Sequence, residues 1–205
     1  MSGTKEVNVD LTQGPIGKQI LQFTVPLLLG NVFQQFYNAA DTVIVGKFVG
    51  KEALAAVGSS GALINLLVSM LMGVAVGAGV VVSRYYGAKQ YEEMRATIHT
   101  TIAFGLISGA VLTVVGVAIT PLILRWMQTP ESVMASSVMY FRIYFAGVLT
   151  TVMYNIGSGI YRALGDSKRP LYFLIISTII NIILDLLLVA VFHMGIGGAA
   201  IATVV

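Results

Sequence analysis

Long apolar segments without a charged residue dominate this chain. Charge-free runs cover residues 19–40, 53–83, 96–124, 143–161, 170–184 and 186–205. Most of them reach the roughly 20 residues that an α-helix needs to cross a bilayer. Only 10% of the 205 residues are Asp, Glu, Lys or Arg, against about 25% in a typical soluble domain. The sequence therefore predicts an all-α integral membrane protein.

The positions of these runs predict the number of membrane spans. We expect five complete spans, at residues 16–46, 53–82, 95–124, 136–162 and 170–192, and the opening of a sixth at Gly195. The last run reaches residue 205 without a polar flank, so we expect a truncated sixth helix and a chain that is a fragment. Residues 1–15 are polar and predict a cytoplasmic N-terminal segment, followed by one helical bundle over residues 16–205.

The basic residues predict how the chain is oriented, because Lys and Arg in short loops favour the cytoplasmic side. On the side of the N-terminus are Lys5, Lys18, Arg84, Lys89, Arg95, Arg162, Lys168 and Arg169, against Lys47, Lys51, Arg125 and Arg142 on the other side. This excess places the N-terminus in the cytoplasm. The basic residues form no dense patch of the kind that binds nucleic acid. There is no cysteine, which excludes disulfides and thiolate metal sites.

Two aspartates, Asp41 and Asp185, lie inside predicted spans, where an isolated carboxylate costs free energy and usually has a function. Asp41 lies six residues before Lys47, and Asp185 lies eight residues before His193. At about 1.5 Å per helical residue, both acids lie roughly 9 to 12 Å from the same end of the bundle. Similar depth permits one shared site.

The first span carries an ordered row of polar side chains. Asn31, Gln34, Asn38 and Asp41 are spaced three, four and three residues apart. They therefore fall within roughly 80° of one helical face. This row predicts the wall of a polar cavity. We call its first three members, Asn31, Gln34 and Asn38, the amide stripe. The alternative for each amide alone is a hydrogen bond that holds two helices together.

Two further polar residues match the depth of the acids. Asn181 lies one turn before Asp185 on the same helical face. Thr203 lies eight residues after Gly195, roughly 12 Å into the sixth helix. A hydroxyl bonded to its own helix carbonyl is the alternative explanation for Thr203 alone. The four residues together predict a site at which three helices converge.

Other residues of the spans admit both a structural and a functional explanation. Tyr140 and Asn155, on the fourth span, could reach the acids and line the cavity, with packing and hydrogen bonding as the alternative. Two pairs of glycines four residues apart predict close helix packing, namely Gly73 with Gly77 and Gly105 with Gly109.

Three stretches resemble MATE (multidrug and toxic compound extrusion) exporters. The first span resembles their first helix in Pro26-Leu-Leu-Leu-Gly30-Asn31 and Gln34-Gln35-x-Tyr37-Asn38-x-x-Asp41-Thr42-x-x-Val45-Gly46. The loop between their fourth and fifth helices is similar to Gly159-Ile-Tyr-Arg162-Ala-Leu-Gly165-Asp166-Ser-Lys168-Arg169-Pro170. Their fifth and sixth helices are similar to Asn181-Ile-Ile-Leu-Asp185 and Gly195-x-Gly197-Gly198-Ala199-Ala200-x-Ala202-Thr203.

The resemblance covers the whole chain, as the N-terminal half of a twelve-helix protein of the NorM/DinF type. It implies a six-helix lobe that forms a V with a second, C-terminal lobe around a central cavity in the cell membrane. The implied partners are the lipid bilayer, small organic substrates and that second lobe. It also implies H⁺ or Na⁺ coupling, with no cofactor, and Na⁺ as the metal that the coupling residues would bind: Asp41, Asn181, Asp185 and Thr203.

The sequence thus favours a secondary transporter that exports organic, cationic compounds in exchange for H⁺ or Na⁺, and not an enzyme. It contains no Walker motif for direct use of ATP. A flippase for lipid-linked precursors is the first alternative, but it would be expected to line its cavity with basic residues. An intramembrane aspartyl protease is the second alternative. Such proteases resemble one another in Tyr-Asp and Gly-x-Gly-Asp, whereas the acids here follow Ala40 and Leu184.

Overall fold

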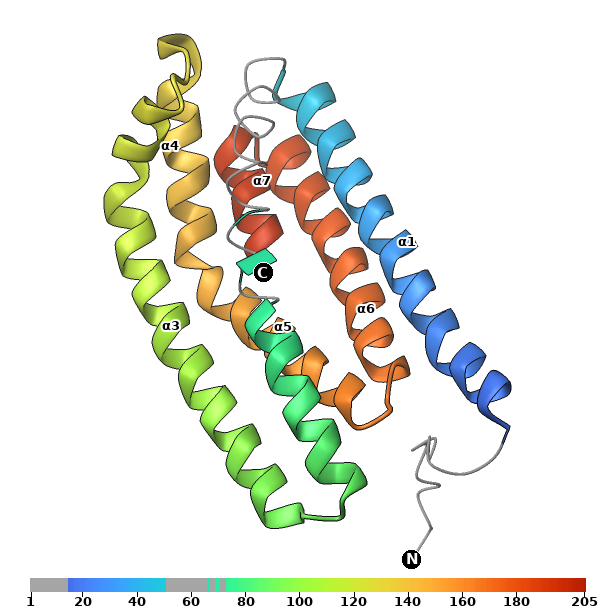
Figure 1. Ribbon diagram of the computed structural model, residues 1–205. Coiled ribbons are helices and arrows are strands. Elements are labelled where there is room, and N and C mark those ends of the chain that lie inside the picture. Colours follow the sequence, from blue (N-terminus) through green and yellow to red (C-terminus); the bar gives the residue numbers. More distant parts are fainter. Residues whose placement is uncertain (1–14, 51–65, 67–68, 71–72) are drawn as a thin grey trace, which may run out of the picture.

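A computed structural model gives the fold and describes residues 15–50, 66, 69–70 and 73–205 (Figure 1). The described part of the chain consists of helices and turns without a β-strand, which confirms the predicted all-α class. The elements are α1 (Ile16–Phe48), a helix at residues 73–87, α3 (Tyr91–Trp126), α4 (Glu131–Ala146), α5 (Val148–Ala163), α6 (Lys168–Asp185), the π-helix η1 (Leu186–Val191) and α7 (Gly195–Val204).

These bounds agree with most of the predicted spans. The first, third and fifth spans correspond to α1, α3 and α6 with η1, and the sixth begins at Gly195 as predicted. The N-terminal segment and more than half of the second span lie outside the described residues, so the described chain does not test them.

Judged by length and apolar composition, fewer described helices qualify as membrane spans than the five that the sequence predicts. Tyr91–Trp126 and Lys168–Val191 are long and apolar enough to cross a membrane, and α4 with α5 would be a third if the bent pair is one span. α1 is long enough, but the polar side chains of the amide stripe lower its hydropathy. α3 ends at Trp126, whose side chain is 77% exposed.

The fourth predicted span, residues 136–162, is bent and not one straight helix. α4 ends at Ala146, α5 begins at Val148, and the two helices meet at an angle of 47° (Figure 1). A side chain on Gly147 would collide with Val204, so the end of α7 occupies the inside of the bend.

The helices pack in two groups that share α4. α1 lies along α6, α3 packs against α5 and α4, and α4 also packs against α7 (Figure 1). The first apolar cluster joins α1, α4, η1 and α7 through Ile44, Val45, Val133, Tyr140, Val189, Ile196, Ala199 and Ala200. The second joins the helix at 73–87 to α3, α4 and α5 through Ala75, Leu124, Phe141, Phe145, Val148, Val152 and Ile156.

Small residues decide how closely α3 approaches α5. A Cβ on Gly105 would collide with Ile156, and one on Gly109 would lie 3.2 Å from the Cα of Leu149, which confirms close packing at this predicted pair. At the other predicted pair, Gly73 and Gly77, an added Cβ would meet no described atom within 4 Å, so the close packing expected there is not found among the described residues.

The turn between α5 and α6 is held by Asp166. Gly165 adopts a φ of +86°, and the Asp166 N–H donates to Tyr161 O at 2.9 Å, which closes the end of α5. The buried Oδ1 of Asp166 accepts from the N–H groups of Lys168 and Arg169, both at 3.1 Å, and so caps α6. Its Oδ2 pairs with Arg169 Nε at 3.1 Å, and that guanidinium lies over the Tyr161 ring.

The helix that begins at Lys168 changes its hydrogen-bond pattern at Asp185. From Leu186 to Val191 it is a π-helix, and the Phe192 N–H then donates to Leu187 O at 2.9 Å. His193 and Gly195 have positive φ angles of 50° and 59°, which turn the chain into α7. A π segment inside a helix is often found at a functional site.

Candidate functional site

The two membrane aspartates are both buried. Asp41 on α1 is 8% exposed and Asp185 at the end of α6 is 0% exposed. α1 packs along α6 and also contacts η1, the segment that follows Asp185. Among the residues that the structure describes, Oδ1 of Asp41 and both carboxylate oxygens of Asp185 have no hydrogen-bond partner. Buried oxygens of this kind are costly unless they bind a proton or a cation.

Asn181 extends the acid pair along α6. It lies one turn before Asp185 and is 4% exposed, and neither atom of its amide has a hydrogen-bond partner among the described residues. Thr178 continues the same buried face, but its hydroxyl donates to Leu174 O at 2.7 Å. The unpartnered polar atoms of α6 are therefore concentrated at its last turn.

Thr203 brings α7 to the site. Its hydroxyl donates to Ala199 O at 2.9 Å, which is the local bond that a helical threonine commonly makes. α7 packs against α1, α4, α6 and η1, so the helix that carries Thr203 adjoins the helices that carry both acids. The structural explanation of Thr203 is thus confirmed, and its membership of a cation site stays a prediction, because a hydroxyl that donates one bond can still accept others.

Three tyrosines lie on the helices that form the site. Tyr37 lies one turn before Asp41 on α1, and Tyr140 is buried in the apolar cluster that joins α1, α4, η1 and α7. Tyr144 lies one turn after Tyr140 on α4. Tyr37 and Tyr144 are absent from the predicted site. Their spacing could have indicated them, since each lies four residues, one helical turn, from a predicted member of the site.

The amide stripe does not share the environment of Asp41. Asn31, Gln34 and Asn38 are exposed on the surface of the lobe, whereas Asp41 is buried. Asn38 Nδ2 donates to Gln35 Oε1 at 3.3 Å on that surface. One helix thus presents neutral polar groups outward and its carboxylate inward.

Asn155 is bound to its own helix. Its Nδ2 donates to Thr151 O at 2.8 Å, and its side chain is only partly buried. No described contact joins it to the acids, so local hydrogen bonding explains this residue and a role in the cavity gains no support. Tyr140, the other predicted residue of the fourth span, is buried in the apolar cluster that joins α1, α4, η1 and α7, and its role in a cavity stays a prediction.

The site offers oxygen atoms to a ligand. No group of three or more His, Cys, Asp or Glu side chains in the described chain is arranged to hold a metal ion. The two carboxylates, the Asn181 amide and the Thr203 hydroxyl are hard oxygen donors, which suit a proton or an alkali cation and not a thiophilic metal.

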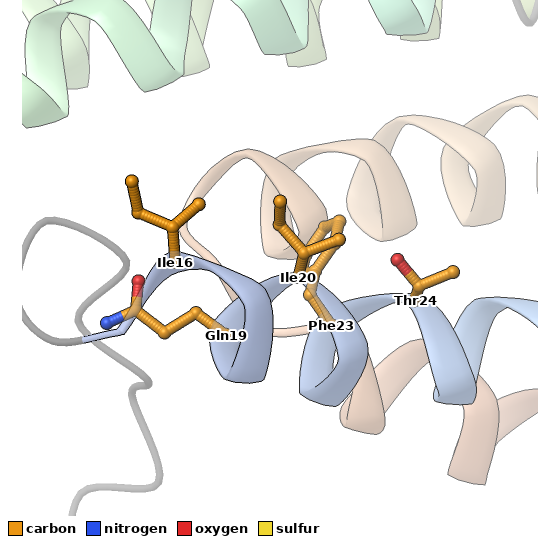
Figure 2. A pocket seen from close by; sticks show the side chains of 5 residues that line it. All are labelled: Ile16, Gln19, Ile20, Phe23 and Thr24. Carbon is orange, nitrogen blue, oxygen red and sulfur yellow. The ribbon is translucent and has the colours of Figure 1, made fainter.

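A depression elsewhere on α1 is separate from these residues. It is lined by Ile16, Gln19, Ile20, Phe23 and Thr24, which follow one another along the beginning of the helix (Figure 2). Thr24 precedes Asp41 by 17 residues, which is roughly 25 Å along a helix. The depression is mostly apolar and is not part of the acid site.

Comparison with known proteins places the chain among transporters. Residues 26–187 match the model of the MatE family. Two Bacillus subtilis (strain 168) proteins are similar. "Probable multidrug resistance protein YoeA" is 41% identical over 187 residues, or 89% of this chain and 40% of that protein. "Probable multidrug resistance protein YpnP" is 34% identical over 197 residues, or 95% of this chain and 44% of that protein.

Solved structures show the same relation. The crystal structure of MATE in complex with MaD3S superimposes with a TM-score of 0.90 at 28% identity, covering 98% of this chain and 45% of that one. The chain therefore spans less than half the length of the transporters it matches, which agrees with the predicted single lobe. The family consists of membrane transporters and not of enzymes, so the protease alternative is set aside. Together these findings show that the chain belongs to the MatE family.

Proposed function

We propose that this chain is one lobe of a secondary multidrug transporter of the cell membrane, and that its acid site binds the coupling cation, H⁺ or Na⁺. The observation that carries the proposal is the burial of Asp41 and Asp185 on two packed helices, with carboxylate oxygens that no described residue satisfies. Similarity to proteins named for multidrug resistance supports export of organic compounds.

The chemistry of the pair explains how a cation could drive the exchange. Two like charges that interact inside a membrane protein repel each other, and binding one H⁺ or Na⁺ lowers that repulsion. Na⁺ would be held by the oxygens of Asp41, Asn181, Asp185 and Thr203. The cation thereby favours the arrangement in which α1, α6 and α7 lie closest together, and its release favours another.

α1 can link this site to the substrate. The same helix carries buried Asp41 and the exposed amide stripe, so a change at the acid moves the surface on which the amides lie. Pro26 lies inside α1 and cannot donate a helical backbone hydrogen bond, which makes bending easier at that point. A cation at the acids and a substrate at the stripe would then exclude each other.

The stripe favours an organic cation over a lipid-linked pyrophosphate. Asn31, Gln34 and Asn38 are neutral and can accept hydrogen bonds, whereas binding pyrophosphate calls for basic side chains. We further propose that the N-terminus lies in the cytoplasm, which the distribution of Lys and Arg supports.

Exchange of the acids for amides tests the proposal. In the full-length gene product, Asp41→Asn and Asp185→Asn should each abolish efflux of ethidium from cells, because an amide cannot take up and release a proton and carries no charge for Na⁺. Glu131→Gln is the matched control, since Glu131 lies exposed at the start of α4 and should not matter. Expression and membrane insertion are equalised by immunoblotting. Efflux at the wild-type rate in both acid variants would remove the pair from the mechanism.

A further inference from the structure

α7 and η1 approach each other so closely at Gly198 that a side chain there would fit only if its neighbours moved by a few tenths of an ångström. A Cβ on Gly198 would lie 3.1 Å from the Cβ of Leu188 and 3.2 Å from its carbonyl carbon. It would also lie 3.0 Å from the Cβ of Met194. These neighbours are backbone or next to backbone, so they cannot swing aside as the end of a long side chain could.

The backbone that faces Gly198 is held in place. Leu188 O accepts a hydrogen bond from Met194 N–H at 2.9 Å, which ties η1 to the start of α7. Leu188 lies within the six-residue π-helix that begins at the residue after Asp185. Around the contact, Ala199 and Ala200 are fully buried at 0% exposure, which leaves little free space.

The contact lies between the two halves of the acid site. Asp185 lies three residues before Leu188, and η1 begins directly after Asp185. On the other side, Thr203 follows Gly198 by five residues of the same helix, roughly 7.5 Å at the usual helical rise. The close approach of η1 and α7 at Gly198 therefore joins the segment that follows Asp185 to the helix that carries Thr203.

We propose that Gly198 is a positioning residue of the cation site: by letting η1 lie directly against α7, it holds Asp185 at the distance from Thr203 that cation binding requires. This inference rests on the proposed function. It predicts that a methyl group at residue 198 weakens cation binding even where the fold survives.

The test measures binding, independently of transport. A cation that binds the native state raises its melting temperature in proportion to the logarithm of its concentration above Kd. The full-length gene product is purified in detergent and melted over a series of Na⁺ concentrations, with choline keeping the ionic strength constant, and over a series of pH values. The double variant Asp41→Asn/Asp185→Asn gives the change in melting temperature that does not involve the acids.

Gly198→Ala should shift the half-saturating Na⁺ or H⁺ concentration by roughly threefold or more, the size expected for substitutions within a coupled network. Gly197→Ala is the matched control in the same helix. Its Cβ would meet the Sδ of Met139 at 3.2 Å, which is the end of a flexible side chain on α4, so the half-saturating concentration should stay unchanged. Leu188→Gly, which loosens the same contact from the other side, should also shift it.

The outcomes separate the two proposals. A wild-type protein whose melting does not respond to cations through the two acids would overturn the proposed function. If the acids do respond, a Gly198→Ala protein that melts earlier with an unchanged half-saturating concentration would show a purely structural glycine and overturn the inference. Should Gly198→Ala fail to fold, an unchanged value in Leu188→Gly would overturn it equally.

Discussion

Val204, at the end of α7, fills the space that the missing side chain of Gly147 leaves at the bend between α4 and α5. The two residues lie 57 positions apart in the sequence. Their contact joins the last described helix to the place where the fourth predicted span breaks. The bend and the seat of α7 are therefore one structural feature.

Gly147→Ala should destabilise the protein by about 1 to 3 kcal/mol, the usual cost of forcing a methyl group into a packed site. Thermal unfolding in detergent measures the loss. Gly157→Ala is the control, because a Cβ on Gly157 has no described neighbour within 4 Å. Val204→Ala added to Gly147→Ala should recover part of the stability. If Val204→Ala restores no stability, the contact between residues 147 and 204 does not account for the loss.

Asp166→Ala should lower stability by about 1 to 2 kcal/mol, because it removes the acceptor for two backbone N–H groups at the start of α6. Asp166→Asn should cost less, since an amide oxygen can still accept those bonds. The ion pair adds little, because the Arg169 side chain is 54% exposed. Equal losses in both variants would assign the effect to the charge and not to the cap.

Gln34→Ala should leave the free energy of unfolding within about 0.5 kcal/mol of the wild type, because its side chain is exposed. The same substitution should change which compounds are exported, if the stripe faces the substrate. Melting curves of the purified wild type and variant are compared, and efflux of a panel of cationic and neutral dyes is measured with both proteins in the same strain. A large stability loss would show that the stripe is covered by another part of the protein.

Reporter fusions after Lys89 and Arg125 test the orientation. These residues lie near the two ends of α3, so they should appear on opposite sides of the membrane, with Lys89 in the cytoplasm. Alkaline phosphatase should be active only in the Arg125 fusion, and a cytoplasmic reporter only in the Lys89 fusion. The reverse pattern would overturn the proposed cytoplasmic N-terminus.

The sequence predicts the helices well because their signal is local. Apolar runs and polar flanks determine where α1, α3 and α6 begin and end, so these bounds follow from composition. The break at Gly147 does not, because glycine is common in membrane helices and the decisive contact comes from Val204, which is distant in the sequence. The π-helix after Asp185 has no local signal either, since its residues are ordinary apolar ones.

The site was predictable to the extent that its members are rare in a membrane. Asp41 and Asp185 stand out because a carboxylate is costly there, and their depth follows from helical rise. Tyr37 and Tyr144 do not stand out, because tyrosine is ordinary near membrane interfaces. Asn155 is a candidate because the fourth span could bring it to the acids, whereas the structure shows its Nδ2 bonded to its own helix.

Trp126 gives the chain a built-in optical probe. It is the one tryptophan among the 205 residues, and its side chain extends outward from the last residue of α3. Under excitation at wavelengths longer than its nine tyrosines absorb, the emission of this chain therefore originates from a single point at one end of a long apolar helix. Vesicles whose lipids carry a quencher at a known depth would report how deep that point lies, with no label attached.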